Sequence, residues 1–347
     1  MFRRRPRRRG LALAGAGSMA GVHAAAAGDA GLRVVAVASA TGTSARHLAG
    51  ELDARRVSAA DLPAGADVLV VATPPTAHVA ATLAGLAAGA TVLVESPIAA
   101  TLSDADRMVT AAGRSTGRLR ATANLRCSPA WRAALERIAQ LGPLGHLSAS
   151  LTQPTPDWGH FRHPLQAGGV LFASGAQLLP LLLDAAGAAF GDTGCINTDR
   201  ITTVAAELST TRDDGADDRA DVTFQFGADH TATLHAEWGP GASTWLQAAG
   251  AGGAVRVEFA PSITVEHNGE PVVVDGASTS PLHQLGYVDQ LAGLSTSNDG
   301  TLDADEATHL LEVVTAAYVS AGRGGEPVPV QLETARDRTP LELWRSS

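Results

Sequence analysis

Residues 11–22 read LALAGAGSMAGV, and this stretch decides the fold. Its first four residues are apolar, as in a short buried strand, and residues 15–20 follow the pattern G-x-G-x-x-A ahead of a helix pattern. Gly15 permits a tight turn, Gly17 lets the backbone approach a pyrophosphate, and Ala20 keeps helix and strand close. The phosphate would lie on free N–H groups at the helix N-terminus. The stretch therefore predicts a dinucleotide-binding domain.

A second strand over residues 32–38 ends at Ser39, which lies 22 residues after Gly17. An acidic residue at an offset of about 20 grips the adenosine ribose of NAD. Serine has no carboxylate to repel a 2′-phosphate. Hydroxyls and a cation follow nearby, at Thr41, Thr43, Ser44 and Arg46. These residues mildly favour NADP over NAD; the alternative is that they only cap a helix over residues 44–53.

Strands and helices alternate onward, which indicates parallel β-α-β units. Strands are predicted over residues 67–72 and 91–95, and a helix over 77–88 ends at Gly89. Residues 73–78 form a loop with two prolines at the carboxyl end of a strand, where open α/β sheets bind ligands.

The following helix, which reaches residue 112, is predicted to begin with a capping box of Ser103 and Asp106.

Together these pieces resemble the Gfo/Idh/MocA (glucose–fructose oxidoreductase / inositol dehydrogenase) family. The resembling segments are GAGSMAGVH at 15–23, ATPPTAH at 72–78, VESPIA at 94–99, NLR at 124–126, LGH at 144–146 and GGVLFASGAQ at 168–177. The resemblance implies an α/β fold: an N-terminal Rossmann doubly wound parallel sheet, then an α/β domain with an open, mostly antiparallel sheet. It also implies reversible hydride transfer between NAD(P) and a sugar, inositol or related polyol.

On this resemblance the chain divides into a basic tail at 1–9, a Rossmann domain at 10–125, a substrate and dimerisation domain at 126–330, and a C-terminal tail at 331–347. The residues assigned to cofactor binding are Gly15, Gly17, Ser18, Met19, Ser39, Thr41, Ala72, Thr73, Pro74, His78, Glu95, Ser96 and Asn124.

The acid and base positions of the family have changed. Its Glu-Lys-Pro motif is Glu95-Ser96-Pro97, its aspartate position is Ala173 and its histidine position is Gln177. The chain has no lysine at all, and arginine cannot replace it in proton transfer. Ser96 and Gln177 can hydrogen-bond a hydroxyl group, but neither titrates near neutral pH. A positioned acid or base typically contributes ~10²–10⁴ in rate, so this change puts catalysis in doubt.

A substitute proton carrier would come from elsewhere. His160 and His163 precede the Gly168-Gly169 turn and are the best-placed histidines, and Tyr287 is a weaker candidate. Residues of these types more often serve as ordinary loop or packing residues. The catalytic candidates are therefore Ser96, Gln177, His160 and His163.

Alternation after residue 126 predicts several antiparallel strands. They are expected at 147–152 (with one exposed face), 201–208, 220–226, 231–238, 254–259 and 263–267, the last followed by a hairpin at Asn268-Gly269. The charged run 212–219 is predicted to be a solvated loop and not a metal site. An amphipathic helix is expected over 301–321, and the apolar residues of the tail from 333 suggest that it docks on the first domain.

Composition narrows the class of protein. The length of 347 residues favours two domains, and a formal charge of −9 argues against nucleic-acid and membrane-surface roles. Two cysteines and no zinc pattern fit a cytoplasmic protein. The arginine-rich start outlines an export signal, but glycines break its apolar stretch, so export is the alternative.

Two functions remain open. The first is an NAD(P)-dependent oxidoreductase with altered acid/base residues, acting on a small molecule and forming a homo-oligomer through the C-terminal sheet. The alternative is a non-catalytic dinucleotide- or ligand-binding relative, a partner subunit or sensor. Fold-level resemblance alone does not separate them.

Overall fold

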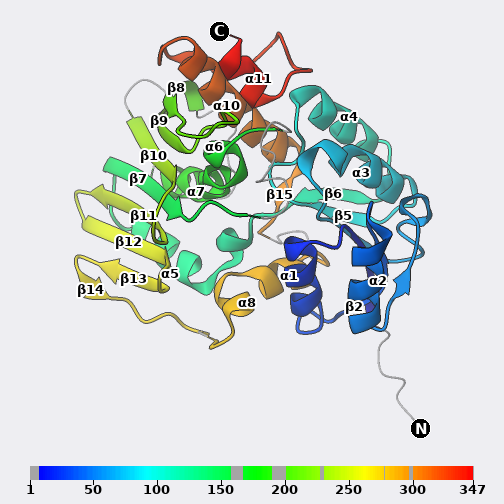
Figure 1. Ribbon diagram of the computed structural model, residues 1–347. Coiled ribbons are helices and arrows are strands. Elements are labelled where there is room, and N and C mark those ends of the chain that lie inside the picture. The colour runs from blue at the N-terminus through cyan, green and yellow to red at the C-terminus, as the bar shows by residue number, and fades with distance from the viewer. Residues whose placement is uncertain are drawn as a thin grey trace.

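The structure is a computed structural model that describes residues 8–157, 167–189, 201–226, 230–276, 278–296 and 300–346. It contains one largely parallel sheet and one largely antiparallel sheet, which confirms the predicted fold class. Figure 1 shows the Rossmann domain on the right, the second sheet on the left, and α8 (Pro281–Gln284) below and between them.

The first sheet has seven strands in the order β15-β6-β5-β4-β1-β2-β3. All pairs are parallel except β15 with β6. The strands are β1 (Arg9–Ala14), β2 (Leu32–Ala38), β3 (Arg55–Arg56), β4 (Val68–Val71), β5 (Thr91–Val94), β6 (Arg118–Ala121) and β15 (Leu302–Asp303). Every residue of β4 and β5 is buried, because helices cover both faces of a parallel sheet.

Two apolar layers enclose this sheet. Leu11 and Leu13 of β1 face one layer, and Ala12 and Ala14 face the other. The first layer is completed by α1 (Ser18–Ala27), α2 (Gly42–Glu51) and α9 (Tyr287–Gly293). The second includes α3 (His78–Ala87) and α4 (Leu102–Ala112).

The predicted start of α4 is wrong. The helix is capped by Thr101, whose hydroxyl accepts a hydrogen bond from the Asp104 N–H at 3.2 Å. Ser103 and Asp106 do not form a capping box, because the Ser103 N–H donates to the Arg336 carbonyl and the Asp106 carboxylate binds the Arg336 guanidinium. Both groups therefore bind Arg336, which lies 230 residues after Asp106 in the sequence.

The second sheet has nine strands in the order β14-β13-β12-β11-β7-β10-β9-β8-β16, and only β7 with β10 is parallel. They are β7 (Leu144–Gln153), β8 (Ile201–Ser209), β9 (Arg219–Phe226), β10 (His230–Trp238), β11 (Ser243–Gly250), β12 (Gly253–Ala260), β13 (Thr264–His267), β14 (Glu270–Pro271) and β16 (Val328–Pro329). Sequence patterning missed β11, whose alanines and glycine alternate weakly with polar residues.

The predicted exposed face of β7 is wrong. Residues 147–151 are all buried, because helices cover one face and the small Ser148 and Ser150 lie at the bottom of a shallow cavity on the other, between larger side chains of neighbouring strands. The hairpin at Asn268-Gly269 is confirmed, since both residues have positive φ (56° and 80°) and join β13 to β14.

Helices cover one face of the second sheet: α5 (Pro129–Ile138), α6 (Val170–Ala173), α7 (Leu179–Ala189) and α10 (Ala304–Gly322). The helix predicted over 301–321 begins at Ala304, because Asp303 and Glu306 form a reciprocal capping box. In the described parts of the chain, no helix is long and apolar enough to cross a membrane.

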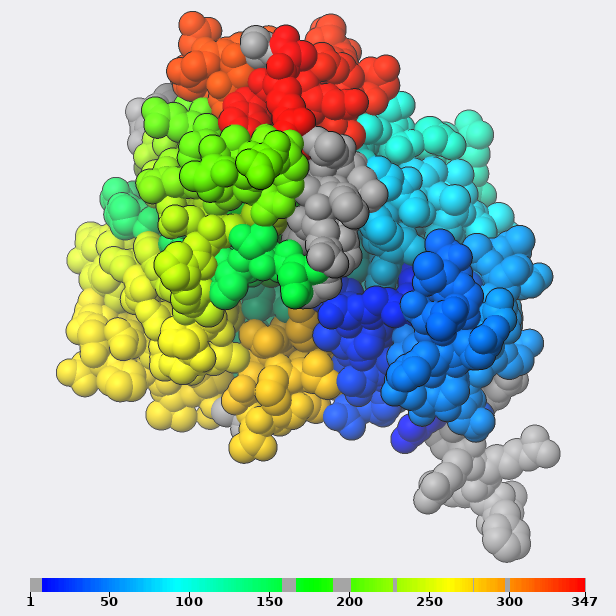
Figure 2. Space-filling model, in the orientation of Figure 1, coloured from blue at the N-terminus to red at the C-terminus, as the bar shows by residue number. Residues whose placement is uncertain are grey.

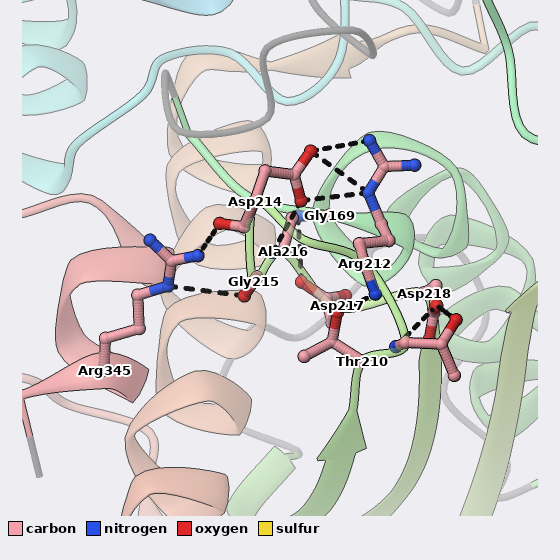
Figure 3. A network of polar contacts seen from close by, with 10 residues as sticks. Gly169, Thr210, Arg212, Asp214, Gly215, Ala216, Asp217, Asp218 and Arg345 are labelled. Atoms are coloured by element: carbon pink, nitrogen blue, oxygen red, sulfur yellow. Dashed lines mark hydrogen bonds and ion pairs between the residues drawn. The ribbon is translucent and has the colours of Figure 1, made fainter.

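The charged run 212–219 is only partly solvated, which corrects the prediction. Asp217 is fully buried, and its carboxylate accepts hydrogen bonds from the N–H groups of Gly169 and Leu171, both at 2.9 Å. The Tyr318 hydroxyl donates to the same carboxylate at 2.7 Å. Figure 3 shows the surrounding network, in which Arg212 binds Asp214 and Arg345 binds the backbone of the same loop.

The C-terminal tail contacts both domains. Arg336 binds Asp106 of α4 with two hydrogen bonds of 2.7 and 2.9 Å, so this part docks on the first domain as predicted. The final helix, α11 (Pro340–Arg345), instead packs on α10, and its Arg345 side chain reaches the loop of Asp214 and Gly215.

Candidate dinucleotide-binding site

The turn from β1 into α1 is built on two glycines with different roles. Gly15 has φ of 116°, and a Cβ atom there would lie 2.3 Å from the Ala72 carbonyl oxygen, so the fold itself requires glycine. Gly17 is the N-cap of α1 with φ of −90°, and no described atom would lie within 4 Å of a Cβ there. The fold gives no steric reason for glycine at position 17.

The start of α1 carries unsatisfied backbone donors. No side chain caps the helix, and its first turn, which begins with Ser18 and Met19, holds no acidic residue. Free N–H groups at a helix N-terminus form an anion site, and the open space at Gly17 lets an anion reach them. Figure 2 shows the dark-blue segment that contains α1 at the surface, directly beside the orange segment.

Ser39 is half-buried directly beyond β2, and it brings no carboxylate to this edge of the sheet. Thr41 is the N-cap of α2, but its hydroxyl donates to the Ser44 hydroxyl at 3.0 Å and does not cap the helix. The helix begins at Gly42, two residues earlier than expected, and the alternative reading of these residues as caps lacks a capping hydrogen bond.

The loop after β4 is held to the loop after β5 by His78. This buried side chain places Nε2 2.9 Å from the Thr73 carbonyl oxygen and Nδ1 3.0 Å from the Ile98 carbonyl oxygen. Burial lowers its pKa, although both carbonyls oppose that shift. His78 therefore positions both loops. Ala72 is half-buried, Pro74 is exposed, and the Thr73 hydroxyl is buried without a partner among the described residues.

A polar cluster lies where β5 and β6 end. The Glu95 carboxylate is 2.5 Å from Nε2 of the fully buried His23 and accepts a hydrogen bond from the Thr122 hydroxyl at 3.1 Å. Burial by itself would raise the Glu95 pKa, but His23 and Thr122 outweigh it and lower the pKa. Ser96 follows, half-buried, with its N–H donating to the Thr122 hydroxyl.

Tyr287 completes the cluster from the first turn of α9. Its ring meets the His23 ring edge-on, with 6.0 Å between centroids. Burial and the nearby Glu95 charge raise the Tyr287 pKa, so the phenol stays protonated. Sequence reasoning did not connect His23 or Thr122 with Glu95, since 72 and 27 residues separate them.

We expect Glu95→Gln to lower the free energy of unfolding by about 1–3 kcal/mol at pH 7, because His23 loses its charged partner. The folded-state pKa of Glu95 lies below its usual 4.5, so this stabilisation is present above pH 4.5 and is lost as the pH falls through the folded value. Urea unfolding between pH 7 and pH 3 should show the difference between wild type and variant shrinking.

The control is Glu51→Gln, an exposed carboxylate whose His47 partner is 3.5 Å away. It should change stability by less than ~0.5 kcal/mol at every pH. A deficit in Glu95→Gln that stays constant down to pH 3 would contradict the charge pairing.

The second-domain candidates lie on and after α6. Ala173 ends that helix, and Gln177 is exposed in the following turn. No hydrogen bond joins the Gln177 side chain to another described residue. His160 and His163 lie outside the described residues.

Asn124 binds the segment before α9, since its side-chain amide donates to the Leu285 carbonyl at 3.0 Å. The side chain thus holds the segment that carries Tyr287. Across the described residues, no group of three or more His, Cys, Asp or Glu side chains is arranged to hold a metal ion.

These features define a Rossmann-type domain whose first helix has an uncapped N-terminus. Residues 9–122 match the sequence model of the GFO_IDH_MocA family, described as an oxidoreductase family with an NAD-binding Rossmann fold. This match covers the first domain, and it confirms the predicted resemblance to the Gfo/Idh/MocA family there.

Solved structures share the whole architecture. GenD2 from gentamicin A biosynthesis, in complex with NAD, superimposes with a TM-score of 0.78 at 23% identity, over 95% of this chain and 99% of that one. An aldose-aldose oxidoreductase from Caulobacter crescentus, complexed with glycerol, gives 0.77 at 21%, over 93% and 100%. The WlbA dehydrogenase from Bordetella pertussis, in complex with NADH and UDP-GlcNAcA, gives 0.76 at 20%, over 94% and 99%.

At these identities the likeness establishes the fold. No curated protein sequence matches the chain.

Proposed function

We propose that this protein binds NAD(P) over Gly17 and is an oxidoreductase for a sugar, inositol or related polyol, with altered acid/base residues. Gly17 carries the proposal. Among the described residues nothing packs against Gly17, so the space beside the uncapped N–H groups at the start of α1 is open to a ligand. The domain match to an NAD-binding oxidoreductase family supports the same ligand.

When bound, the nicotinamide would supply hydride transfer. The chain's own residues would hold the pyrophosphate on the N–H groups of Ser18 and Met19. The Ser96 hydroxyl and the Gln177 amide can orient a substrate oxygen by hydrogen bonding, but they cannot carry its proton. His160 and His163 are the proposed carriers.

One observation favours the alternative, a non-catalytic dinucleotide-binding protein. Two described titratable groups near Ser96 are poor proton carriers, one because it is paired with another residue and one because of its shifted pKa. Glu95 is paired with His23 and has a lowered pKa, whereas Tyr287 has a raised pKa.

The test begins with the purified protein, which is checked for bound nucleotide and titrated with NADH and NADPH by fluorescence. We expect binding, followed by hydride transfer with at least one member of a panel of sugars and inositols. Turnover lost in His160→Ala or His163→Ala, at unchanged cofactor affinity, would identify the carrier. Tight binding without turnover, unaffected in those variants, would favour the alternative, and no binding would exclude both.

The triple variant Ser96→Lys/Ala173→Asp/Gln177→His restores the family residues. It tests whether missing activity is due to the changed acid/base residues or to a pocket that no longer accepts the family's substrates. Gained activity would mean that the pocket still accepts a family substrate.

We also propose that a second copy covers the open face of the nine-stranded sheet. This face alternates exposed and half-buried residues along β9 and β10 and holds a shallow cavity of about 600 Å³ next to Trp245.

A further inference from the structure

An arginine that lies far from the glycine turn in sequence reaches the adenosine end of the proposed site. Arg56 belongs to β3, which pairs in parallel with β2, so that Arg56 lies beside Val37. Its side chain extends past the end of β2 to Gly42, the first residue of α2.

The guanidinium rests directly on this glycine. A Cβ atom on Gly42 would lie 2.9 Å from Nη2, 3.4 Å from Cζ and 3.8 Å from Nε of Arg56. Nη2 is closer than a Cβ contact allows, whereas Cζ and Nε are at ordinary contact distances. Gly42 does not have a positive φ, so its backbone does not require glycine. The lack of a side chain at position 42 lets the guanidinium lie against the start of α2.

Arg56 has no protein partner in the described part of the chain. No hydrogen bond or ion pair joins its exposed guanidinium to another described residue. The adjacent Arg55 differs, because its guanidinium donates to the Ala64 carbonyl at 2.9 Å. Arg56 is thus held by packing against Gly42 while its hydrogen-bond donors remain free.

The surroundings of Arg56 are of the same sign. The first turn of α2 contains no acidic residue, and the N-terminal end of a helix is itself positive. A cation at that end is unfavourable unless an anion joins it. Ser39, only three residues before Gly42, provides no carboxylate. Arg56 and the start of α2 are both positive, and no carboxylate of the described chain pairs with Arg56. An anionic ligand would balance this charge.

We propose that Arg56 binds the 2′-phosphate of NADP and makes this the preferred cofactor; the inference rests on the proposed nucleotide site. The end of β2 is where the adenosine ribose lies in Rossmann domains, and an arginine nearby accommodates the 2′-phosphate. Arg56 fits this role because its planar, unpaired donors match a phosphate.

The test compares NADPH and NADH affinities by fluorescence titration of the full chain. Wild type should prefer NADPH. Arg56→Ala should weaken NADPH binding by ~10- to 100-fold, about 1.4–2.8 kcal/mol, and leave NADH binding unchanged. Arg55→Ala is the matched control on the same strand, and it should leave both affinities unchanged. Competition by 2′-phospho-AMP and AMP should follow the same pattern.

Gly42→Ala gives a second test that does not remove the charge. The new methyl group displaces the guanidinium, while alanine suits a helix better than glycine. NADPH affinity should fall and the melting temperature should stay the same or rise.

The outcomes separate the two proposals. Absence of binding by both nucleotides would overturn the proposed function and this inference with it. Binding of NADH and NADPH with equal affinity, or an equal loss of both in Arg56→Ala, would overturn the role of Arg56 and leave the proposed function standing.

Discussion

Gly17→Asp is expected to weaken NADH and NADPH binding by at least ~100-fold, since charge-assisted hydrogen bonds contribute about 1.5–3 kcal/mol each and this change opposes several at once. The new carboxylate would occupy the open space at the start of α1 and repel a pyrophosphate. The fold should not suffer. Aspartate is a preferred N-cap, so the free energy of unfolding should stay equal or rise by up to ~1 kcal/mol.

Nucleotide titration and urea unfolding of the same preparation measure both effects. Gly28→Asp is the control, because Gly28 is an equally open glycine at the other end of α1. At 1.5 Å per residue its charge lies about 15 Å from the start of α1. This distance exceeds the ~8–10 Å Debye length, so the affinities for NADH and NADPH should be unchanged. Undiminished nucleotide binding in Gly17→Asp would refute the site.

Asp217→Ala should destabilise the protein by about 3–5 kcal/mol, the largest effect on stability expected here. Its carboxylate is the shared acceptor for the Gly169 and Leu171 N–H groups and the Tyr318 hydroxyl (Figure 3). Burial and the Asp217 charge raise the Tyr318 pKa, which keeps that hydroxyl protonated as a donor. Removing the carboxylate leaves all three donors buried with no charged acceptor.

Urea denaturation at pH 7 measures this loss. Asp213→Ala, an exposed aspartate in the same charged run, is the matched control and should change stability by less than ~0.5 kcal/mol. Equal effects of the two substitutions would mean that the run is solvated throughout, as its composition suggested. The network also fixes the turn before α6, so partially unfolded Asp217→Ala protein should lose the geometry of Gln177.

The sequence by itself determined the first domain. Turn glycines, apolar strand runs and their spacing are local features, so Gly15 and Gly17 predicted the cradle and the strand–helix alternation predicted the parallel sheet. The sequence also shows that the lysine of the family's Glu-Lys-Pro motif is replaced by Ser96, because a motif position can be identified without coordinates. Helix starts were less accurate, since the cap at Thr101 depends on which groups the tail occupies.

Tertiary structure alone decided which polar groups meet. Glu95 and His23 are 72 residues apart, and Asp217 and Tyr318 are 101 apart, so no local pattern joins them. A charged run looks solvated in sequence, yet three donors from distant segments make burial of Asp217 tolerable. Likewise, only the fold places the Arg56 guanidinium against Gly42, 14 residues earlier in the sequence. Backbone preference acts over a few residues, whereas the pairing of buried charges depends on the whole fold.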